Sequence, residues 1–180
     1  MGAQWLITAK HCFENISTPG DVEVYATNDR VNYGSPTTHA KKIFTHDDAD
    51  LALVELGKPI ELTSYKKITS GHQLEAGEQV ALYGYGVVDN EGNQTTWLKK
   101  ATTKLDKYVD TYDGHMLQGS GVDGTAMRGD SGGPIIDKAG EIIGIVSTSD
   151  GIEAATKDSP YTAVDLSSYG EWINKTMKIS

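Results

Sequence analysis

The chain has 180 residues, enough for one ordinary domain or two small ones with a buried core, which excludes a mini-protein scaffold. Its hydrophobic and aromatic content excludes wholesale disorder. Lys plus Arg number 16 against 25 Asp plus Glu, and the formal net charge of -9 disfavours a broad nucleic-acid footprint or adhesion to an anionic membrane. No apolar stretch approaches the roughly 18 residues that cross a bilayer, and the sequence does not open with a signal-peptide pattern.

Short β-branched and aromatic runs, separated by turn sequences, predict an all-β protein. The 20 glycines fall between these runs and not in one linker. The predicted strands cover residues 5–9, 21–27, 41–45, 51–56, 79–85, 97–105, 133–137 and 141–147. Between Gly57 and Gly77 the sequence is polar and irregular, which is typical of a segment that joins two β units.

The last segment has a helical period instead of an alternating one. Apolar residues that share one helix face are Leu166, Tyr169, Trp172, Ile173 and Met177. We therefore expect a C-terminal helix within residues 166–180.

Metal and cofactor chemistry has little support in the sequence. The single cysteine, Cys12, cannot close an internal disulfide, and no Cys/His cluster has the spacing of zinc ligands. The acidic segment 106–113 is interpreted as a solvated loop in preference to a calcium site. The sequence thus predicts neither a cofactor nor a metal.

The strongest signal for chemistry is the hexapeptide from Gly129 to Pro134, which reads Gly-Asp-Ser-Gly-Gly-Pro and precedes an apolar strand. Its glycines permit backbone angles that aim amide N–H groups at one point, and small neighbours let a substrate approach the Ser131 hydroxyl. The alternative is that these residues only form a hairpin turn. A serine nucleophile also needs a base and an orienting carboxylate.

Candidates for that base and carboxylate lie earlier in the chain. His11 follows the apolar strand 5–9, whereas the other four histidines have polar surroundings. Asp50 stands at the mouth of the buried strand 51–56, where a carboxylate can be held rigidly beside a histidine. Asp47 and Asp48 are interpreted as exposed residues at the start of that strand.

Three segments in this order resemble the His, Asp and Ser signatures of trypsin-like (chymotrypsin-fold) serine proteases: Thr8 to Cys12, Asp50 to Leu53, and Gly129 to Pro134. The resemblance continues through Gly84-Tyr85-Gly86, Gly144 to Ser147 and Tyr161 to Val164, and so covers essentially the whole chain. It implies two antiparallel Greek-key β-barrels, with the active site in the cleft between them and a C-terminal α-helix.

The resemblance also implies a role for each residue. His11 takes the proton from Ser131 Oγ and later gives it to the leaving amine, while Asp50 fixes the tautomer of His11. The backbone N–H groups of Gly129 and Ser131 form the oxyanion hole. The segment 147–149 offers an edge strand to the substrate backbone.

Only ten residues precede His11, whereas active family members carry a free N-terminal Ile or Val and the first barrel strands there. We therefore expect an incomplete first barrel. The strands were lost in a fragment, or the chain is incomplete, or an adjacent chain supplies them. All three explanations leave strand edges exposed unless a partner covers them. Cys12 is either the partner of an absent upstream cysteine or a small buried thiol. The few cysteines are more typical of a bacterial member.

Asp130 pairs with a new N-terminal ammonium in many relatives, and that pair shapes the oxyanion hole. Because no such N-terminus is visible here, a zymogen-like chain is an alternative to an active one. A non-catalytic, protease-like binding module is a second alternative, although all three catalytic residues are present.

The resemblance places residues of the specificity pocket as well. Its base falls on Thr125, so the aspartate that selects Arg or Lys is absent. Further substrate-binding positions are Ala126, Arg128, Ser147, Thr148, Ser149 and Ser159. These side chains predict an uncharged, shallow pocket that prefers small or medium uncharged P1 residues. Arg128 leaves an acidic P1 residue as the alternative, against which stands Val146, where several glutamate-specific relatives have a histidine.

We therefore expect a truncated first barrel (1–62), a linker (63–75), a second barrel (76–165) and a helix (166–180). The expected function is that of a secreted, extracellular serine endopeptidase acting on protein or peptide substrates. A protease inhibitor is a candidate partner, whereas nucleic acid and membrane are not expected as partners.

Overall fold

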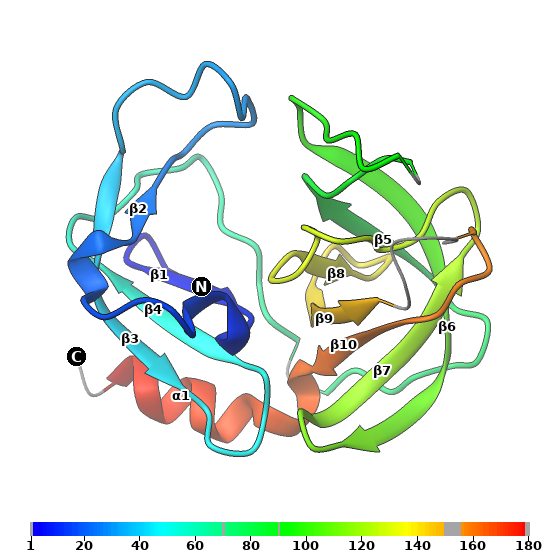
Figure 1. Ribbon diagram of the computed structural model, residues 1–180. Helices are drawn as coiled ribbons and strands as arrows, with labels where there is room; N and C mark the ends of the chain where they lie inside the picture. The colour runs from blue at the N-terminus through cyan, green and yellow to red at the C-terminus, as the bar shows by residue number, and fades with distance from the viewer. Residues whose placement is uncertain (1, 70, 90, 150–155, 179–180) are drawn as a thin grey trace.

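The computed structural model describes residues 2–69, 71–89, 91–149 and 156–178, and it forms two β lobes side by side (Figure 1). The strands are β1 (Trp5–Thr8), β2 (Glu23–Val24), β3 (Thr38–Thr45), β4 (Ala52–Leu56), β5 (Gln79–Gly84), β6 (Lys99–Thr111), β7 (Gly114–Gly121), β8 (Pro134–Ile136), β9 (Ile142–Ser149) and β10 (Tyr161–Asp165). The helical elements are the 3-10 turns η1 (Lys10–Phe13), η2 (Pro19–Asp21) and η3 (Leu166–Tyr169), followed by the helix α1 (Gly170–Lys178). No described helix has the length and apolar character needed to cross a membrane.

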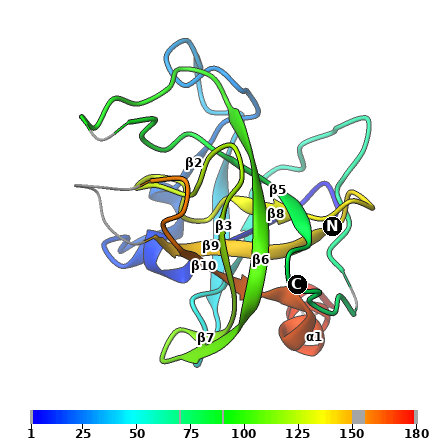
Figure 2. The same cartoon turned by 90° about the vertical axis from the view of Figure 1, so that its right-hand side faces the viewer.

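The two lobes differ in closure. In the first, four antiparallel strands follow the order β1-β4-β3-β2, so β1 and β2 are its edges. In the second, six strands close into a barrel in the order β10-β7-β6-β5-β8-β9. The view turned by 90° shows the long strand β6 running along the face of this barrel (Figure 2). Two β units with an incomplete first barrel and a C-terminal helix are therefore confirmed.

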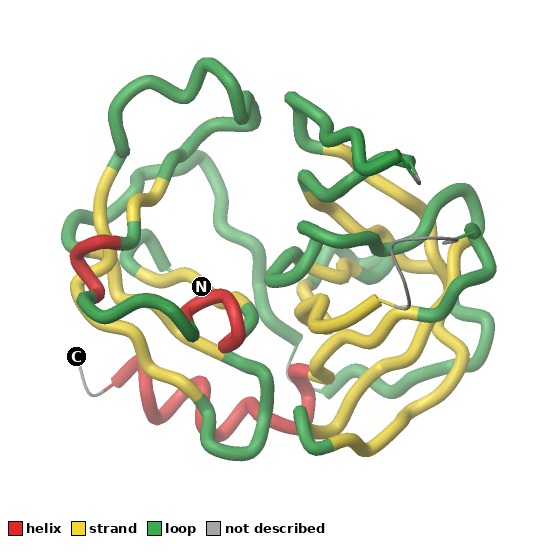
Figure 3. Tube along the Cα trace, viewed as in Figure 1, coloured by secondary structure: helices red, strands yellow, loops and turns green. Residues whose placement is uncertain are grey.

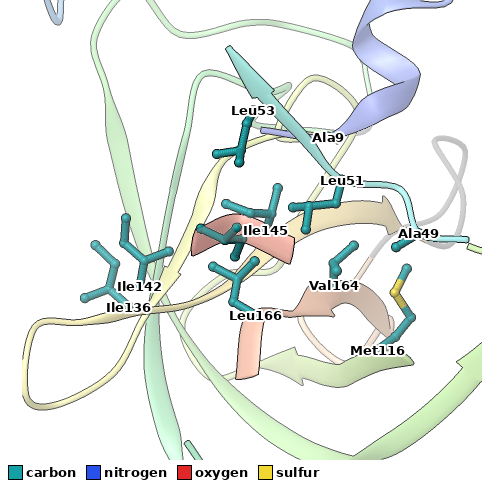
Figure 4. Close-up of a cluster of buried hydrophobic side chains, with 11 residues drawn as sticks. Ala9, Ala49, Leu51, Leu53, Met116, Ile136, Ile142, Ile145, Val164 and Leu166 are labelled. Atoms are coloured by element: carbon teal, nitrogen blue, oxygen red, sulfur yellow. The ribbon is translucent and has the colours of Figure 1, made fainter. Parts of the chain in front are cut away.

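An apolar cluster fills the space between the two lobes (Figure 4). Leu51 and Leu53 of the first lobe are fully buried against Ile145 and Val164 of the second, and Leu166 joins them from the 3-10 turn before the helix. Burying such a side chain stabilises the fold by about 1.5–3 kcal/mol. The cluster therefore fixes the position of one lobe relative to the other.

The inner face of the first sheet is less well covered. Its buried core has only Ala40, Val54 and Leu56, surrounded by partly buried apolar side chains. A cavity of about 600 Å³ opens there, and residues of both edge strands line it, including Leu6 of β1 and Val24 of β2. The exposed strand edges that the sequence led us to expect are thus accompanied by an exposed apolar surface.

Several predicted elements need correction. The prediction of a strand over 21–27 was too long, because only Glu23–Val24 pairs with β3. The prediction of a loop over 106–113 was wrong, since β6 continues to Thr111 and turns directly into β7, which was not predicted. The expected helix is present as a helical segment at the end of the described chain (Figure 3). It consists of a 3-10 turn up to Tyr169 and an α-helix from Gly170.

Candidate active site

Strand pairing in the first sheet brings His11 and Asp50 together. β1 and β4 are antiparallel, with Thr8 opposite Ala52, so the end of β1 lies beside the start of β4. His11 Nδ1 is 2.7 Å from Asp50 Oδ2, and the backbone N–H of His11 donates to Asp50 Oδ1 at 2.8 Å. Both carboxylate oxygens thus orient the histidine, whose side chain remains 38% exposed.

Asp50 is itself buried and receives a third hydrogen bond. The Ser147 hydroxyl of β9 donates to Asp50 Oδ2 at 2.6 Å. Burial alone would raise the pKa of Asp50, but the hydrogen bonds from Ser147 and from the backbone and ring of His11 outweigh it, and the pKa is lowered. An ionised Asp50 favours the His11 tautomer that carries its proton on Nδ1, which leaves Nε2 free to accept one.

Ser131 lies in a glycine turn where the two lobes meet. Gly129 and Gly132 on either side have φ of 94° and 82°, in the region that other residues rarely adopt. A Cβ on Gly132 would overlap the hydroxyl oxygen of Thr8 in β1, so only glycine allows this approach. The Ser131 hydroxyl donates to the backbone carbonyl of Ser147 at 3.1 Å, and in the described structure it forms no hydrogen bond with His11.

Two amides of this turn have no acceptor among the described residues: those of Gly129 and Ser131. The amides of Asp130, Gly132 and Gly133 donate to backbone carbonyls at 2.8–3.0 Å. Both amides are therefore available to an acceptor without first breaking other hydrogen bonds.

The carboxylate of Asp130 points away from Ser131 into the second barrel. Its two oxygens accept from the amides of Gly86 at 2.8 Å and Met127 at 2.9 Å. A Cβ on Gly84 or Gly86 would overlap this carboxylate, which explains the Gly-Tyr-Gly sequence. Burial raises the pKa of Asp130, although both hydrogen bonds act against it.

The residues assigned to the specificity pocket are only partly brought together. Thr125 donates its hydroxyl to the carbonyl oxygen of Ser159 at 3.0 Å, Ala126 is buried, and Arg128 is exposed. Thr148 and Ser149 pair with β10 on one side, and no described strand pairs with them on the other. Cys12 is exposed, which does not fit the alternative of a small buried thiol, and its Sγ would lie 3.6 Å from a Cβ on Gly132.

Sequence reasoning missed two features of this region. Ser147 is predicted to bind substrate through its backbone, and its hydroxyl is in addition buried on Asp50; a hydroxyl residue directly after an apolar run was the available signal. Loops of the two lobes also meet. Asp29 and Trp97 form an isolated antiparallel β-bridge, and the Arg30 amide donates to the Thr96 carbonyl at 2.8 Å. No sequence pattern indicates that contact.

A sequence model of the family described as Trypsin matches residues 1–173. Protein masquerade of Drosophila melanogaster is 26% identical over 100% of this chain and 20% of its own length. Transmembrane protease serine 11E of Mus musculus is 28% identical over 94% of this chain and 45% of its own length. The Venom peptide isomerase heavy chain of Agelenopsis aperta is 24% identical over 98% of this chain and 85% of its own length. The chain thus spans less than half the length of the first two relatives.

Two solved structures share the fold. The scabies mite inactivated protease paralogue S-D1 superposes with a TM-score of 0.83 at 19% identity, covering 99% of this chain and 84% of that one. Neuropsin, a serine protease of mouse brain, gives a TM-score of 0.81 at 18% identity, covering 98% and 86%.

Proposed function

This chain belongs to the trypsin family of serine proteases, and on that premise we propose that it is a serine endopeptidase that works through an acyl-enzyme intermediate. The observation that carries the proposal is the hydrogen-bonded pair of His11 and Asp50, 2.7 Å apart. Ser147 links this pair to Ser131, since its hydroxyl donates to Asp50 and its carbonyl accepts from the Ser131 hydroxyl. In this proposal His11 serves as the base and Asp50 as its orienting carboxylate, and the free amides of Gly129 and Ser131 receive the oxyanion.

In the proposed mechanism, Ser131 Oγ attacks the scissile carbonyl carbon while His11 Nε2 takes the hydroxyl proton. The tetrahedral oxyanion accepts hydrogen bonds from the amides of Gly129 and Ser131. His11 then gives the proton to the leaving amine, and water hydrolyses the acyl-enzyme by the same steps in reverse. In this mechanism the Ser131 hydroxyl must first exchange its bond to the Ser147 carbonyl for one to His11.

Asp50 acts on the charge of His11 in this scheme. The protonated imidazole that forms during attack lies beside an ionised, buried carboxylate, so its positive charge is stabilised. The lowered pKa of Asp50 keeps that carboxylate ionised across the neutral range.

For the substrate we propose small or medium uncharged P1 residues. Thr125 is uncharged and its hydroxyl donates to the Ser159 carbonyl, while the charged Arg128 side chain is exposed. Neither residue therefore places a buried charge in the pocket. The segment 147–149 is proposed to pair with the substrate backbone through its free edge. We also propose that the protein acts outside the cell on protein substrates and meets protease inhibitors there.

A zymogen-like or non-catalytic binding role is the second candidate, and two observations favour it. The Ser131 hydroxyl is bound to a carbonyl oxygen, and Asp130 is held by backbone amides without a cation among the described residues. One protein of the same fold is described as an inactivated protease paralogue.

Intact mass after exposure to a fluorophosphonate tests the proposal. The activated Ser131 oxygen attacks phosphorus, the O–P bond forms, and fluoride leaves. We expect one adduct on the parent chain, none on Ser131→Ala, and an unchanged adduct on the control Ser35→Ala, which alters an exposed loop serine. A folded parent chain that stays unlabelled, while a known serine protease reacts in the same tube, would favour the binding role.

A further inference from the structure

Lys10 connects the two segments that carry His11 and Asp50. It is the first residue of η1 and directly precedes His11. Its ammonium crosses to the loop between β3 and β4, where it donates to the carbonyl oxygens of His46 at 2.9 Å and Asp47 at 3.3 Å. Both carbonyls lie within four residues of Asp50.

The rest of this loop is held from the opposite side. The amide of Asp50 donates to the carbonyl oxygen of Asp113, at the turn between β6 and β7, at 2.8 Å. The His46 ring packs edge-on against Tyr169 and Trp172, with centroids 4.9 and 5.2 Å apart. These contacts tie the loop to the second barrel and to the helix, whereas Lys10 ties it to the histidine.

A lysine suits this position chemically. An ammonium has three donors on a flexible stem, so it can serve two consecutive carbonyls and fix the orientation of the peptide plane between them. Because Lys10 and His11 share one 3-10 turn, the loop is located relative to the backbone of His11 itself. A neutral side chain of similar length would leave both carbonyls to water.

We infer that Lys10 is a positioning residue that sets the geometry between the Asp50 carboxylate and the His11 ring by clamping the loop of His46 and Asp47. The kinetic consequence rests on the proposed peptidase function. The geometric consequence does not, because the hydrogen bond between His11 and Asp50 is present in the resting protein.

The test compares Lys10→Met, which keeps the stem and removes the donors, with Lys10→Arg, whose guanidinium can again reach two carbonyls. Lys42→Met is the matched control, since it removes an equal charge from an exposed lysine on the neighbouring strand β3. The rates of fluorophosphonate labelling and of peptide hydrolysis are measured. Proton NMR records the far-downfield signal of the His11 Nδ1 proton.

We expect Lys10→Met to be labelled about tenfold more slowly, with a lower kcat and an unchanged KM, because small displacements of a catalytic group cost rate and not binding. Its Nδ1 proton signal should move upfield. Lys10→Arg should recover most of the rate and the signal, and Lys42→Met should match the parent chain. Should Lys10→Met fail to fold, Lys10→Gln, which is too short to reach both carbonyls, takes its place.

An unchanged Nδ1 signal in Lys10→Met overturns the inference, as does an unchanged labelling rate in a chain whose parent is labelled. If the parent chain is not labelled at all, the peptidase proposal fails by itself. The NMR comparison then still decides the role of Lys10.

Discussion

Ser147 and Asp50 join the closed barrel to the open sheet through one buried hydrogen bond of 2.6 Å. The donor is on β9 and the acceptor precedes β4, so the bond crosses the boundary between the lobes. Asp50 therefore depends on the second barrel for its ionised state as well as on His11.

Replacing Ser147 by alanine should lower the free energy of unfolding by about 2 kcal/mol, because hydrogen bonds to charged groups contribute more to stability than bonds between neutral groups. It should also raise the pKa of Asp50. Urea unfolding at neutral pH measures the first effect. Ser131→Ala, which removes a bond to a neutral carbonyl, is the control; equal losses in the two variants would contradict this account.

The stability of the folded state should fall on acidification, because the pKa of Asp50 is lowered. Its pKa in the folded state lies below the ordinary 3.8, so its stabilisation is fully present above that value. As the pH falls further, through the folded-state pKa, the unfolded chain binds the proton first and the stabilisation is lost. Urea midpoints of the parent chain and Asp50→Asn, measured from about pH 6 to about pH 2, should therefore converge on acidification.

Asp130 changes the stability on acidification in the opposite direction to Asp50. The comparison of the parent chain with Asp50→Asn is needed to separate the two effects. Its pKa is raised by burial, so acidification relieves a cost in the folded state and does not remove a benefit. A gap between parent and Asp50→Asn that stays constant down to the lowest pH would refute the role assigned to Asp50.

Alanine at Gly84 should disturb the loop of Ser131 from the far side of Asp130. The new methyl group would overlap the Asp130 carboxylate, so we expect a loss of about 3 kcal/mol and slower fluorophosphonate labelling. Gly20→Ala is the control, because a Cβ there meets nothing within 4 Å and the backbone φ is ordinary. Thermal unfolding of both variants settles the comparison, and equal Tm values would contradict the predicted overlap.

Removing Lys41 should strand a buried carboxylate. Glu55 is 4% exposed at its side chain, one oxygen accepts from the Lys41 ammonium at 2.6 Å, and the other has no partner among the described residues. Lys41→Met should cost about 2 kcal/mol, a value reduced because the lysine is half exposed. Lys42→Met should cost almost nothing.

A double variant separates the loss of the ion pair from the loss of the Lys41 stem. Lys41→Met with Glu55→Met removes the stranded charge and should recover most of the stability. Failure to recover would mean that Lys41 acts through its stem and not through the ion pair.

The element boundaries show where sequence reasoning reaches its limit. β6 was predicted to end at Leu105, because the acidic residues beyond it resemble a loop, yet Asp106 and Asp110 only occupy its exposed face. β7 was not predicted, because its glycines weaken the strand pattern of that segment. Gly119 is instead required by packing, since a Cβ there would overlap the Tyr161 ring.

The candidate site was predictable to the extent that motifs are local. The order of the three signatures pointed to His11, Asp50 and Ser131, and the structure brings the first two into contact. The role of Lys10 and of the Ser147 hydroxyl depends on the register between distant strands. Register is decided by pairing and not by the residues of one segment.

Closure of the second barrel and openness of the first sheet imply unequal resistance to local opening. Amides of β6 and β7 are protected by neighbours on both sides and should exchange with deuterium only on global unfolding. Amides of β1 and β2, each at an edge, should exchange through smaller fluctuations of lower free energy. The proposed nucleophile precedes a strand of the lobe that we expect to open last, and its proposed base follows an edge strand of the lobe that we expect to open first.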